Sequence, residues 1–443
     1  MKHTMKHTAK AAAALALAAL LAAFCITPLI SALEEPLEYT ITSPYDDIDW
    51  DTVGLYKANL HTHTVFSDGT EVLSDVVEEY YRQGYDILAI SDHGVVGAPW
   101  DQAAKTVFPL NVQSWFKERT VLTSGRLAEI TAGTDRDGRG MIRVPQAIEM
   151  NAATLYKNHV NGYFAGWGQG WWGFENDYRT PVAMTECNGG LSIIDHPGDW
   201  LKSRDNPAAA HDPANVQFFA DILRDHPSCL GMEAYNGGDG VTQRDRELWD
   251  ELLRRLAPEG RNVFGFANDD AHYLRDIGRT AEFFYMPANT VDNLRTAMEN
   301  GTFLASSRID RALLGSFEGD REKEFPLVTR MNIDEDAGTI ALTVTDTDKV
   351  EWIADGVVIA EGASLNLRDY PDEIGSYVRA QLTGPGGITT TQAFLIEDGR
   401  DHSVNDAPTG WDKFAYDALR WLTANKIAFL VQLLMEEIGK LLG

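Results

Sequence analysis

Short apolar stretches alternate with amphipathic segments along the chain from Gly54 to about Ser307. The apolar stretches predict strands at LYKANL, YDILAI, VPQAIEM, LSII, CLGME and NVFGFA. Between them, apolar residues recur at helical spacing in residues 71–83, 214–225, 243–256 and 291–299. Strands that alternate with helices in this way predict an α/β domain with mostly parallel strands. The polar residues that follow each strand are then expected at one face, where βα loops build sites.

After about Asp310 the pattern changes to alternating apolar and polar positions with turn signals, as in TIALTVTDTDKVEWIADGVVIAEG and YVRAQLTGPGGITTTQAFLI. Such alternation is typical of half-buried antiparallel strands, so residues 310–397 are expected to form a small β-sandwich. A polar linker, residues 398–410, leads to an amphipathic helix predicted at residues 411–442. Its charges interrupt the apolar run too often for a membrane-spanning helix. The helix is expected either to dock on the body of the protein or to bind a membrane surface or a second copy.

The first 32 residues have the pattern of an export signal. Lysines precede an apolar run from Ala11 to Ile30, and Ile30-Ser31-Ala32 offers a small-residue cleavage site. The apolar run is about 20 residues long, which is also enough to span a bilayer if it stays uncut. We therefore expect an exported protein, extracellular or at the cell surface, with residues 1–32 as a signal peptide or an N-terminal anchor.

Composition narrows the classes of partner. The chain has 443 residues, is 44% hydrophobic and carries a formal net charge of -28. So acidic a surface repels nucleic acid, and no nucleic-acid partner is expected. Outside the signal segment the only cysteines are Cys187 and Cys229, which can either pair or remain two buried thiols.

The stretch NLHTHTVFSDGT, residues 59–70, contains the strongest chemical signal. His61 and His63 alternate by two, so both side chains leave the same side of a strand and can bind one ion. Asp68 follows in a turn that can bring its carboxylate back over the strand end.

Later strand ends each supply further imidazoles or carboxylates, namely His93, Glu149, His159, His196, Asp270 and His272. Together with His61, His63 and Asp68, nine such groups at one face match what several borderline divalent ions require. The sequence therefore predicts a site for several divalent ions, and Zn, Mn and Fe all suit these ligands.

The motifs HTHTVFSDG, AISDHG, IIDHPG, GMEAYNGG and ANDDAH, in this order within residues 54–307, resemble the motif series of the PHP (polymerase and histidinol phosphatase) superfamily. The resemblance implies a distorted (β/α)7 TIM-like barrel, a site for two or three metal ions and phosphoester hydrolysis. By motif, one ion takes His61, His63, Glu149 and Asp270. Glu149 bridges to a second ion held by His159 and His196, and a third takes Asp68, His93 and His272.

Ions so placed lower the pKa of a water that they share and neutralise charge on a phosphoryl group. The main hypothesis is hydrolysis of a small phosphomonoester or phosphodiester by a metal-bridging hydroxide, with Asp270, His272 and Glu149 as catalytic residues. One alternative is amide or lactone hydrolysis on the same site, and another is a cell-surface binding protein with structural metals. A polymerase-associated editing role conflicts with the export signal and the acidic charge.

Four residues are predicted to contact substrate. Lys57 shares the strand side of His61, and Arg279 shortly follows His272, so each is a candidate phosphate clamp. Glu233 and Asn236, in GMEAYNGG, are expected in the pocket wall, although Glu233 can instead orient a ligand histidine. Arg308 is a further candidate cation.

Aromatic residues concentrate in two segments near the expected site, residues 95–145 and YFAGWGQGWWGFENDY. Glycines between tryptophans favour a loop, and loops at this face line the substrate mouth. The tryptophans form either a lid or stacking wall for a ring-bearing substrate, or a small core of the loop's own: Trp100, Trp115, Trp167, Trp171 and Trp172.

Overall fold

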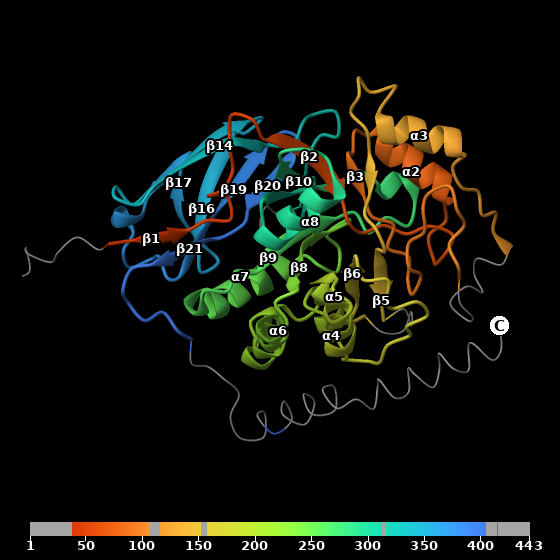
Figure 1. Cartoon of the computed structure of the whole chain (residues 1–443). Coiled ribbons are helices and arrows are strands. Elements are labelled where there is room, and N and C mark those ends of the chain that lie inside the picture. The colour runs from red at the N-terminus through yellow and green to blue at the C-terminus, as the bar shows by residue number, and fades with distance from the viewer. Residues whose placement is uncertain (1–37, 107–115, 152–156, 312–315, 405–413, 415–443) are drawn as a thin grey trace, which may run out of the picture.

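The computed structural model describes residues 38–106, 116–151, 157–311, 316–404 and 414 (Figure 1). The export signal expected at residues 1–32, Trp115 and, apart from Phe414, the helix expected at residues 411–442 lie outside this part. Within the described residues no helix is both long enough and apolar enough to cross a membrane.

The strands and helices expected from the alternation pattern are present. The strands are β2 (Gly54–Asn59), β3 (Ile87–Leu88), β5 (Ile148–Met150), β7 (Leu191–Ile194), β8 (Cys229–Asn236) and β9 (Phe264–Asn268). The helices are α2 (Leu73–Arg82), α6 (Pro213–Asp225), α7 (Asp245–Leu256) and α8 (Val291–Asn300). Helix ends follow local chemistry: Asp212 caps α6 before Pro213, and α8 ends at Gly301, whose φ of 73° suits glycine.

Other elements of this region were not expected from the sequence. They include strands β4 (Ile142–Arg143), β6 (Val160–Tyr163), β10 (Thr280–Met286) and β11 (Phe303–Ser307). They also include helices α3 (Ser124–Ala132), α4 (Arg179–Cys187) and α5 (Pro197–Leu201), with 3-10 turns at Pro207–Ala210, Ala257–Glu259 and Leu274–Asp276. Strand β10 is buried along its whole length, so it lacks the alternation that marks a strand with one solvent face.

Two sheets carry these strands. One has the order β5-β6-β7-β8-β9, and the other contains the run β11-β10-β2-β3-β4. β7, β8 and β9 are parallel to one another, as are β2, β3 and β4, whereas β5-β6-β7 and β2-β10-β11 pair antiparallel. The expectation of mostly parallel strands is therefore wrong for these neighbours. Helix α4 lies between β6 and β7 and helix α8 between β10 and β11, and after each helix the chain returns antiparallel instead of crossing over to a parallel strand.

The architecture is mixed α/β, and the two sheets do not merge into one closed sheet. Single β-bridges join them at two seams, Thr62 with Ala271 and His93 with Glu149. Both bridges involve predicted metal ligands or their neighbours: Thr62 lies between His61 and His63, Ala271 lies between Asp270 and His272, and His93 and Glu149 are themselves predicted ligands. A closed (β/α)7 barrel stays a prediction, while the seams already bring the strand ends of both sheets together.

The C-terminal half supplies antiparallel strands, as the alternation predicts. They are β12 (Ile309–Asp310), β13 (Phe317–Glu318), β14 (Leu327–Asp334), β15 (Thr339–Thr345), β16 (Lys349–Ala354), β17 (Val357–Glu361), β18 (Ser364–Asn366), β19 (Tyr377–Gly384), β20 (Gly387–Thr391) and β21 (Phe394–Glu397), with a 3-10 turn at Leu367–Asp369. β14, β15 and β18 form a separate three-stranded sheet. β20 pairs with β11, so the expected boundary near residues 307–310 falls within one continuous sheet.

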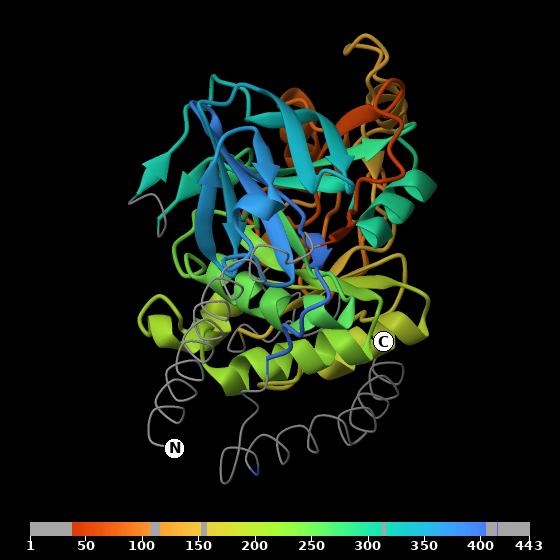
Figure 2. The same cartoon turned by 90° about the vertical axis from the view of Figure 1, so that its left-hand side faces the viewer.

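Helix α7 joins the two halves of the molecule. It packs beside α6 and covers β8 on one side, and its polar face meets β16 and β19 on the other (Figures 1 and 2). Trp249 is buried in this packing and donates from Nε1 to the carbonyl oxygen of Val263 at 2.7 Å. At the far edge of the large sheet, β1 (Thr40–Thr42) pairs antiparallel with β21.

Candidate metal centre

His61 and His63 follow β2 directly and lie against the end of β9. The backbone N–H of His63 donates to the carbonyl of Ala271 at 3.0 Å, and that of Asp270 donates to the carbonyl of His61 at 3.0 Å. The extended backbone turns Thr62 away and places the two Nε2 atoms 3.1 Å apart, on the same side as the sequence predicts.

Glu149 stands at the middle of the centre, and its side chain is fully buried. Its Oε2 lies 3.1 Å from each of three imidazole nitrogens, those of His61, His63 and His93. Its Oε1 lies 2.6 Å from Nδ1 of His159 and 3.2 Å from Nε2 of His196. One carboxylate therefore faces two groups of imidazoles through its two oxygens, which is the geometry of a bridging ligand.

Asp270 completes the first group. Its Oδ1 lies 3.0 Å from Nε2 of His63 and 3.4 Å from Nε2 of His61. Asp270 has a φ of 45° and His196 a φ of 28°, a region that non-glycine residues rarely adopt. Such backbone strain persists where the surroundings enforce it and concentrates at functional sites.

An outer group faces solvent. Oδ2 of Asp68 lies 3.2 Å from Nε2 of His272 and 3.6 Å from Nε2 of His93. The side chains of Asp68 and His272 are 28% and 30% exposed, whereas that of Glu149 is inaccessible. The centre thus has a buried floor and one open side, and the nine predicted metal ligands all lie in it.

The spacing of these atoms fits metal ligands. Ligands about 2.1 Å from a tetrahedral ion lie about 3.4 Å from one another, close to the separations around Glu149 and Asp270. Although several of these buried atoms lie close together, five of them make no hydrogen bond of good geometry among the described residues, namely Glu149 Oε2, Asp270 Oδ1, His93 Nδ1 and both ring nitrogens of His159. Unpaired buried carboxylate and imidazole atoms are costly unless a cation satisfies them. The residues present therefore fit divalent ions.

The charges of the centre depend on one another. Burial opposes the charge of Glu149, but the neighbouring imidazoles outweigh it and hold the pKa of Glu149 well below its usual value. Burial lowers the pKa of His93 to about 4, whereas the neighbouring carboxylates outweigh burial at His61 and His63 and raise their pKa values well above the usual one, and they raise the pKa of His196 to about 10. Metal binding to these last three imidazoles would therefore release protons.

Glu233 lies behind the ligands and is fully buried. Its Oε1 lies 2.9 Å from Nδ1 of His61 and accepts a hydrogen bond from Asn268 at 3.0 Å. Its Oε2 accepts from the backbone N–H of His196 at 3.0 Å and from Nδ2 of Asn236 at 2.9 Å. Of the two expectations for Glu233, this geometry favours the orientation of a ligand histidine over contact with substrate.

A second supporting chain was not recognised in the sequence. Nδ1 of His63 lies 3.3 Å from Oγ of Ser67, which donates to the buried carboxylate of Asp92 at 2.6 Å. Asp92 precedes the ligand His93 in AISDHG, and a carboxylate beside a ligand motif is the signal that would have identified it.

Replacing Glu233 with glutamine is expected to weaken metal affinity about 10- to 100-fold, because the amide removes the negative charge that aligns His61. Titration of metal into the metal-free variant, followed by elemental analysis after dialysis, measures this loss. Glu186→Gln is the matched control. Glu186 also pairs with a histidine, with 2.7 Å between its Oε2 and Nδ1 of His226, but neither residue is a predicted metal ligand. Equal affinities of the two variants would show that Glu233 does not support the ligands.

The three cations that the sequence offers for phosphate binding contact other parts of the protein. Lys57 stacks over the ring of Tyr85, 4.1 Å from its centroid, and donates to the carbonyl of Gln83. Arg308 is buried and donates to the carbonyl oxygens of Gly278, Asp320, Lys323 and Gly386. Arg279 forms an ion pair with Asp276 at 2.9 Å. All three cations therefore have partners other than the metal ligands in this structure, and a phosphate-binding role for them stays a prediction.

Asn236 and Lys117 lie closer to the ligands. Nδ2 of Asn236 is 3.3 Å from Oδ2 of Asp270, so this predicted substrate residue also holds a ligand. Lys117 donates from Nζ to the carbonyl of Gly69, next to Asp68, at 2.6 Å. Lys117 belongs to the segment 95–145, in which the sequence drew attention only to aromatic residues.

The aromatic segments contribute to packing. Trp100 and Trp171 are each 1% exposed, and Nε1 of Trp171 donates to Oδ1 of Asn151 at 2.7 Å. These two tryptophans belong to two different parts of the protein's hydrophobic core and form neither an exposed lid nor a core of the loop alone, while Trp172 is 37% exposed. Cys187 is exposed and Cys229 buried, and both are free thiols, so they do not pair.

No family model matches the chain, and no curated protein matches it. Solved structures that resemble it include a two-domain protein from Bacteroides vulgatus described as containing a predicted PHP-like metal-dependent phosphoesterase. The two chains are 15% identical, the match covers 82% of this chain and 91% of that one, and the TM-score is 0.41. The structural neighbours thus include a PHP-like phosphoesterase.

Two further neighbours have other described activities. The lesion-specific endonuclease PfuEndoQ from Pyrococcus furiosus is 12% identical over 60% of this chain and 58% of its own, with a TM-score of 0.33. An amidohydrolase from Chromobacterium violaceum is 13% identical over 55% of this chain and 96% of its own, with a TM-score of 0.31. With such low identities and TM-scores, what this chain does has to follow from the geometry of its own metal centre.

Proposed function

We propose that the protein is an exported, PHP-type metal-dependent hydrolase that cleaves small phosphomonoesters or phosphodiesters. The observation that supports this proposal is the arrangement around Glu149, a buried carboxylate that meets five imidazole nitrogens through its two oxygens. Export, and with it a place outside the cytoplasm, is proposed from the sequence of residues 1–32.

Bound divalent ions supply a nucleophile from water at neutral pH and neutralise charge on a phosphoryl group. Glu149 would hold two neighbouring ion positions, one with His61, His63 and Asp270 and the other with His159 and His196. Asp68 and His272, on the exposed side, would hold a third together with His93. Because the open side lies at Asp68 and His272, a substrate phosphoryl group reaches these residues first.

Phosphoester hydrolysis is tested with the exported part of the chain, residues 33–443. We expect two or three ions per chain by elemental analysis. We also expect release of p-nitrophenol from p-nitrophenyl phosphate or from bis(p-nitrophenyl) phosphate, with loss of the release on addition of chelator. His61→Ala and Asp270→Ala should lose both bound metal and turnover, because each removes a group from the most buried ion position.

The outcomes separate the alternatives. Bound metal without release from either ester, but with chelator-sensitive cleavage of p-nitroacetanilide or a lactone, would replace the phosphoesterase by an amide or lactone hydrolase. Bound metal without turnover on any of these compounds would favour a binding protein with structural metals. Retention of metal and turnover in both alanine variants would contradict the site itself.

A further inference from the structure

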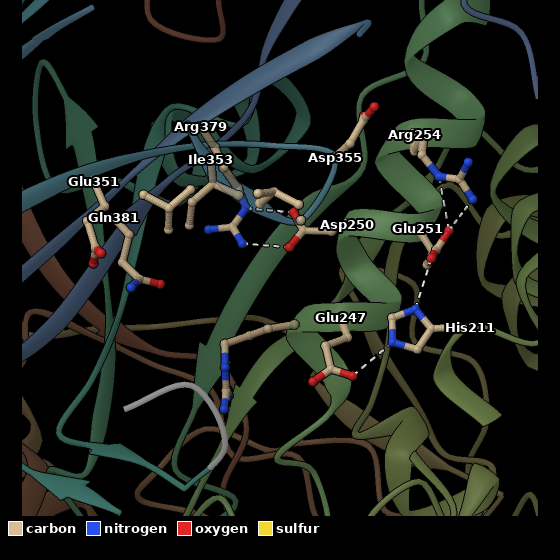
Figure 3. A pocket seen from close by; sticks show the side chains of 14 residues that line it. His211, Glu247, Asp250, Glu251, Arg254, Glu351, Ile353, Asp355, Arg379 and Gln381 are labelled. Carbon is tan, nitrogen blue, oxygen red and sulfur yellow. Dashed lines mark hydrogen bonds and ion pairs between the residues drawn. The ribbon is translucent and has the colours of Figure 1, made fainter. Parts of the chain in front are cut away.

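A second cavity, of about 360 Å³, lies between helix α7 and the sheet formed by β16, β17 and β19 (Figure 3). Glu247, Asp250, Glu251 and Arg254 approach it from the helix, and Glu351 and Gln381 approach it from the sheet. None of the nine predicted metal ligands lines this cavity. A volume of this size accommodates a small organic molecule.

Most charges in the cavity wall already have partners. Arg379 forms a two-pronged pair with Asp250, at 2.8 Å from Nε and 2.7 Å from Nη2. His211 lies between Glu251 and Glu247, at 2.9 and 3.0 Å. Arg244, Arg254 and Lys349 supply counter-charges to Glu247, Glu251 and Glu351, and Asp355 adds one further carboxylate to the wall. With most of its charges paired inside the protein, the cavity has little reason to select an anion.

Two deeply buried polar groups in the wall are not satisfied. Gln381 is 3% exposed, and its Oε1 has no hydrogen-bond partner among the described residues. Arg246 is 1% exposed, and its Nε likewise has none there, although its Nη atoms bind Asp239. Leaving a buried donor or acceptor unpaired costs free energy, which a ligand able to pair with it recovers.

The position of Gln381 follows from the alternation of β19. Tyr377, Arg379 and Gln381 share one face of the strand, toward α7. The first two bind Asp250, with the Tyr377 hydroxyl 2.8 Å from Oδ1, while Gln381 lies beyond the reach of that carboxylate and lines the cavity. Glu351 is the cross-strand partner of Gln381 on β16, and Figure 3 shows the two side chains next to each other.

Apart from Asp355, the remaining side chains of the wall are apolar, and the wall is open to solvent at β17. Ile353, Val357 and Val358 line it, and the last two are 63% and 46% exposed on β17. β17 pairs with β16 alone, so this wall is at the edge of the sheet.

We propose that this cavity is a binding site for a neutral mono- or disaccharide. A hydroxyl group both donates and accepts, so neighbouring hydroxyls of one sugar can pair with Oε1 of Gln381 and Nε of Arg246. The C–H face of the sugar ring then covers Ile353 and Val358. The internally paired charges favour a neutral ligand over a charged one. The site is separate from the metal centre, so the inference does not depend on the proposed hydrolase function.

The test is isothermal titration calorimetry of residues 33–443 with glucose, galactose, mannose, N-acetylglucosamine, maltose and cellobiose. We expect saturable binding of at least one of these sugars at millimolar or lower concentration. Gln381→Leu should weaken that binding about tenfold, because the variant removes the unpaired acceptor. Gln102→Leu is the matched control, since Gln102 is an exposed glutamine outside the cavity, and its affinity should not change.

A second variant tests the same cavity in case Gln381→Leu does not fold. Val358→Arg places a long charged side chain at the exposed rim, where the fold tolerates it, and should also abolish sugar binding. Binding that survives both cavity variants, or that His61→Ala abolishes while Gln381→Leu leaves it intact, would place the sugar elsewhere and overturn the proposal. Absence of heat with all six sugars would overturn it as well.

Discussion

Replacing Glu149 with glutamine is expected to lower turnover of a phosphoester by at least about 10³-fold and to reduce the bound metal by one ion or more. The amide keeps the size of the side chain but carries no charge, and only one of its two ends can act as a ligand. Both groups of imidazoles around Glu149 then lose their shared anion. Steady-state kinetics and elemental analysis on the same preparation measure the two effects.

Glu282→Gln is the matched control for this experiment. Glu282 is also a fully buried glutamate near a strand end, but burial raises its pKa well above the usual value, and it is not one of the predicted metal ligands. The amide there should leave metal content and turnover unchanged. A Glu149→Gln variant that behaves like the control would rule out a bridging carboxylate at residue 149.

Replacing Asp250 with alanine is expected to lower the free energy of unfolding by about 3–5 kcal/mol. The reason is that Arg379 is 1% exposed and has Asp250 as its ion-pair partner, so the variant leaves a buried guanidinium without a counter-charge. The Tyr377 hydroxyl loses its acceptor in the same step. Equilibrium urea denaturation followed by tryptophan fluorescence measures the change.

A double variant distinguishes two causes of this loss of stability, the unpaired charge of Arg379 and the lost packing between α7 and β19. Asp250→Leu with Arg379→Met replaces the pair by apolar side chains of similar size, which is often nearly neutral for stability. We expect it to recover most of the stability that Asp250→Ala loses. If the double variant were as unstable as the single one, packing between α7 and β19 rather than the unpaired charge would explain the loss.

The gathering of the nine candidate ligands could be predicted from the sequence because most of them sit at strand ends. Where neighbouring strands run parallel, a residue just past one strand is close to residues just past the next, however far apart they lie in the chain. LSII, which coincides with β7, places His196 two residues beyond the strand end. The alternation of His61 and His63 needs only the geometry of an extended backbone.

The errors arise where position along a strand, rather than side of the strand, decides the contact. Lys57 shares a side with His61, but four residues of extended chain span about 13 Å, so Lys57, inside β2, lies about that far from His61 beyond the strand end. The contact between His61 and Glu233 joins residues 172 positions apart, and spacing alone cannot predict it. Likewise, the carbonyl oxygens that surround Arg308 come from three separate turns whose meeting depends on the whole fold.

The pairing of β1 with β21 bears on how the chain finishes folding. Thr40–Thr42 is synthesised early, yet its partners Leu395, Ile396 and Glu397 emerge only after every predicted metal ligand has been made. Contacts between residues so distant in sequence close slowly, because a long loop must be ordered before the strands meet. The first described strand is therefore expected to join the sheet among the last events of folding, after the ligands of the metal centre have been able to assemble.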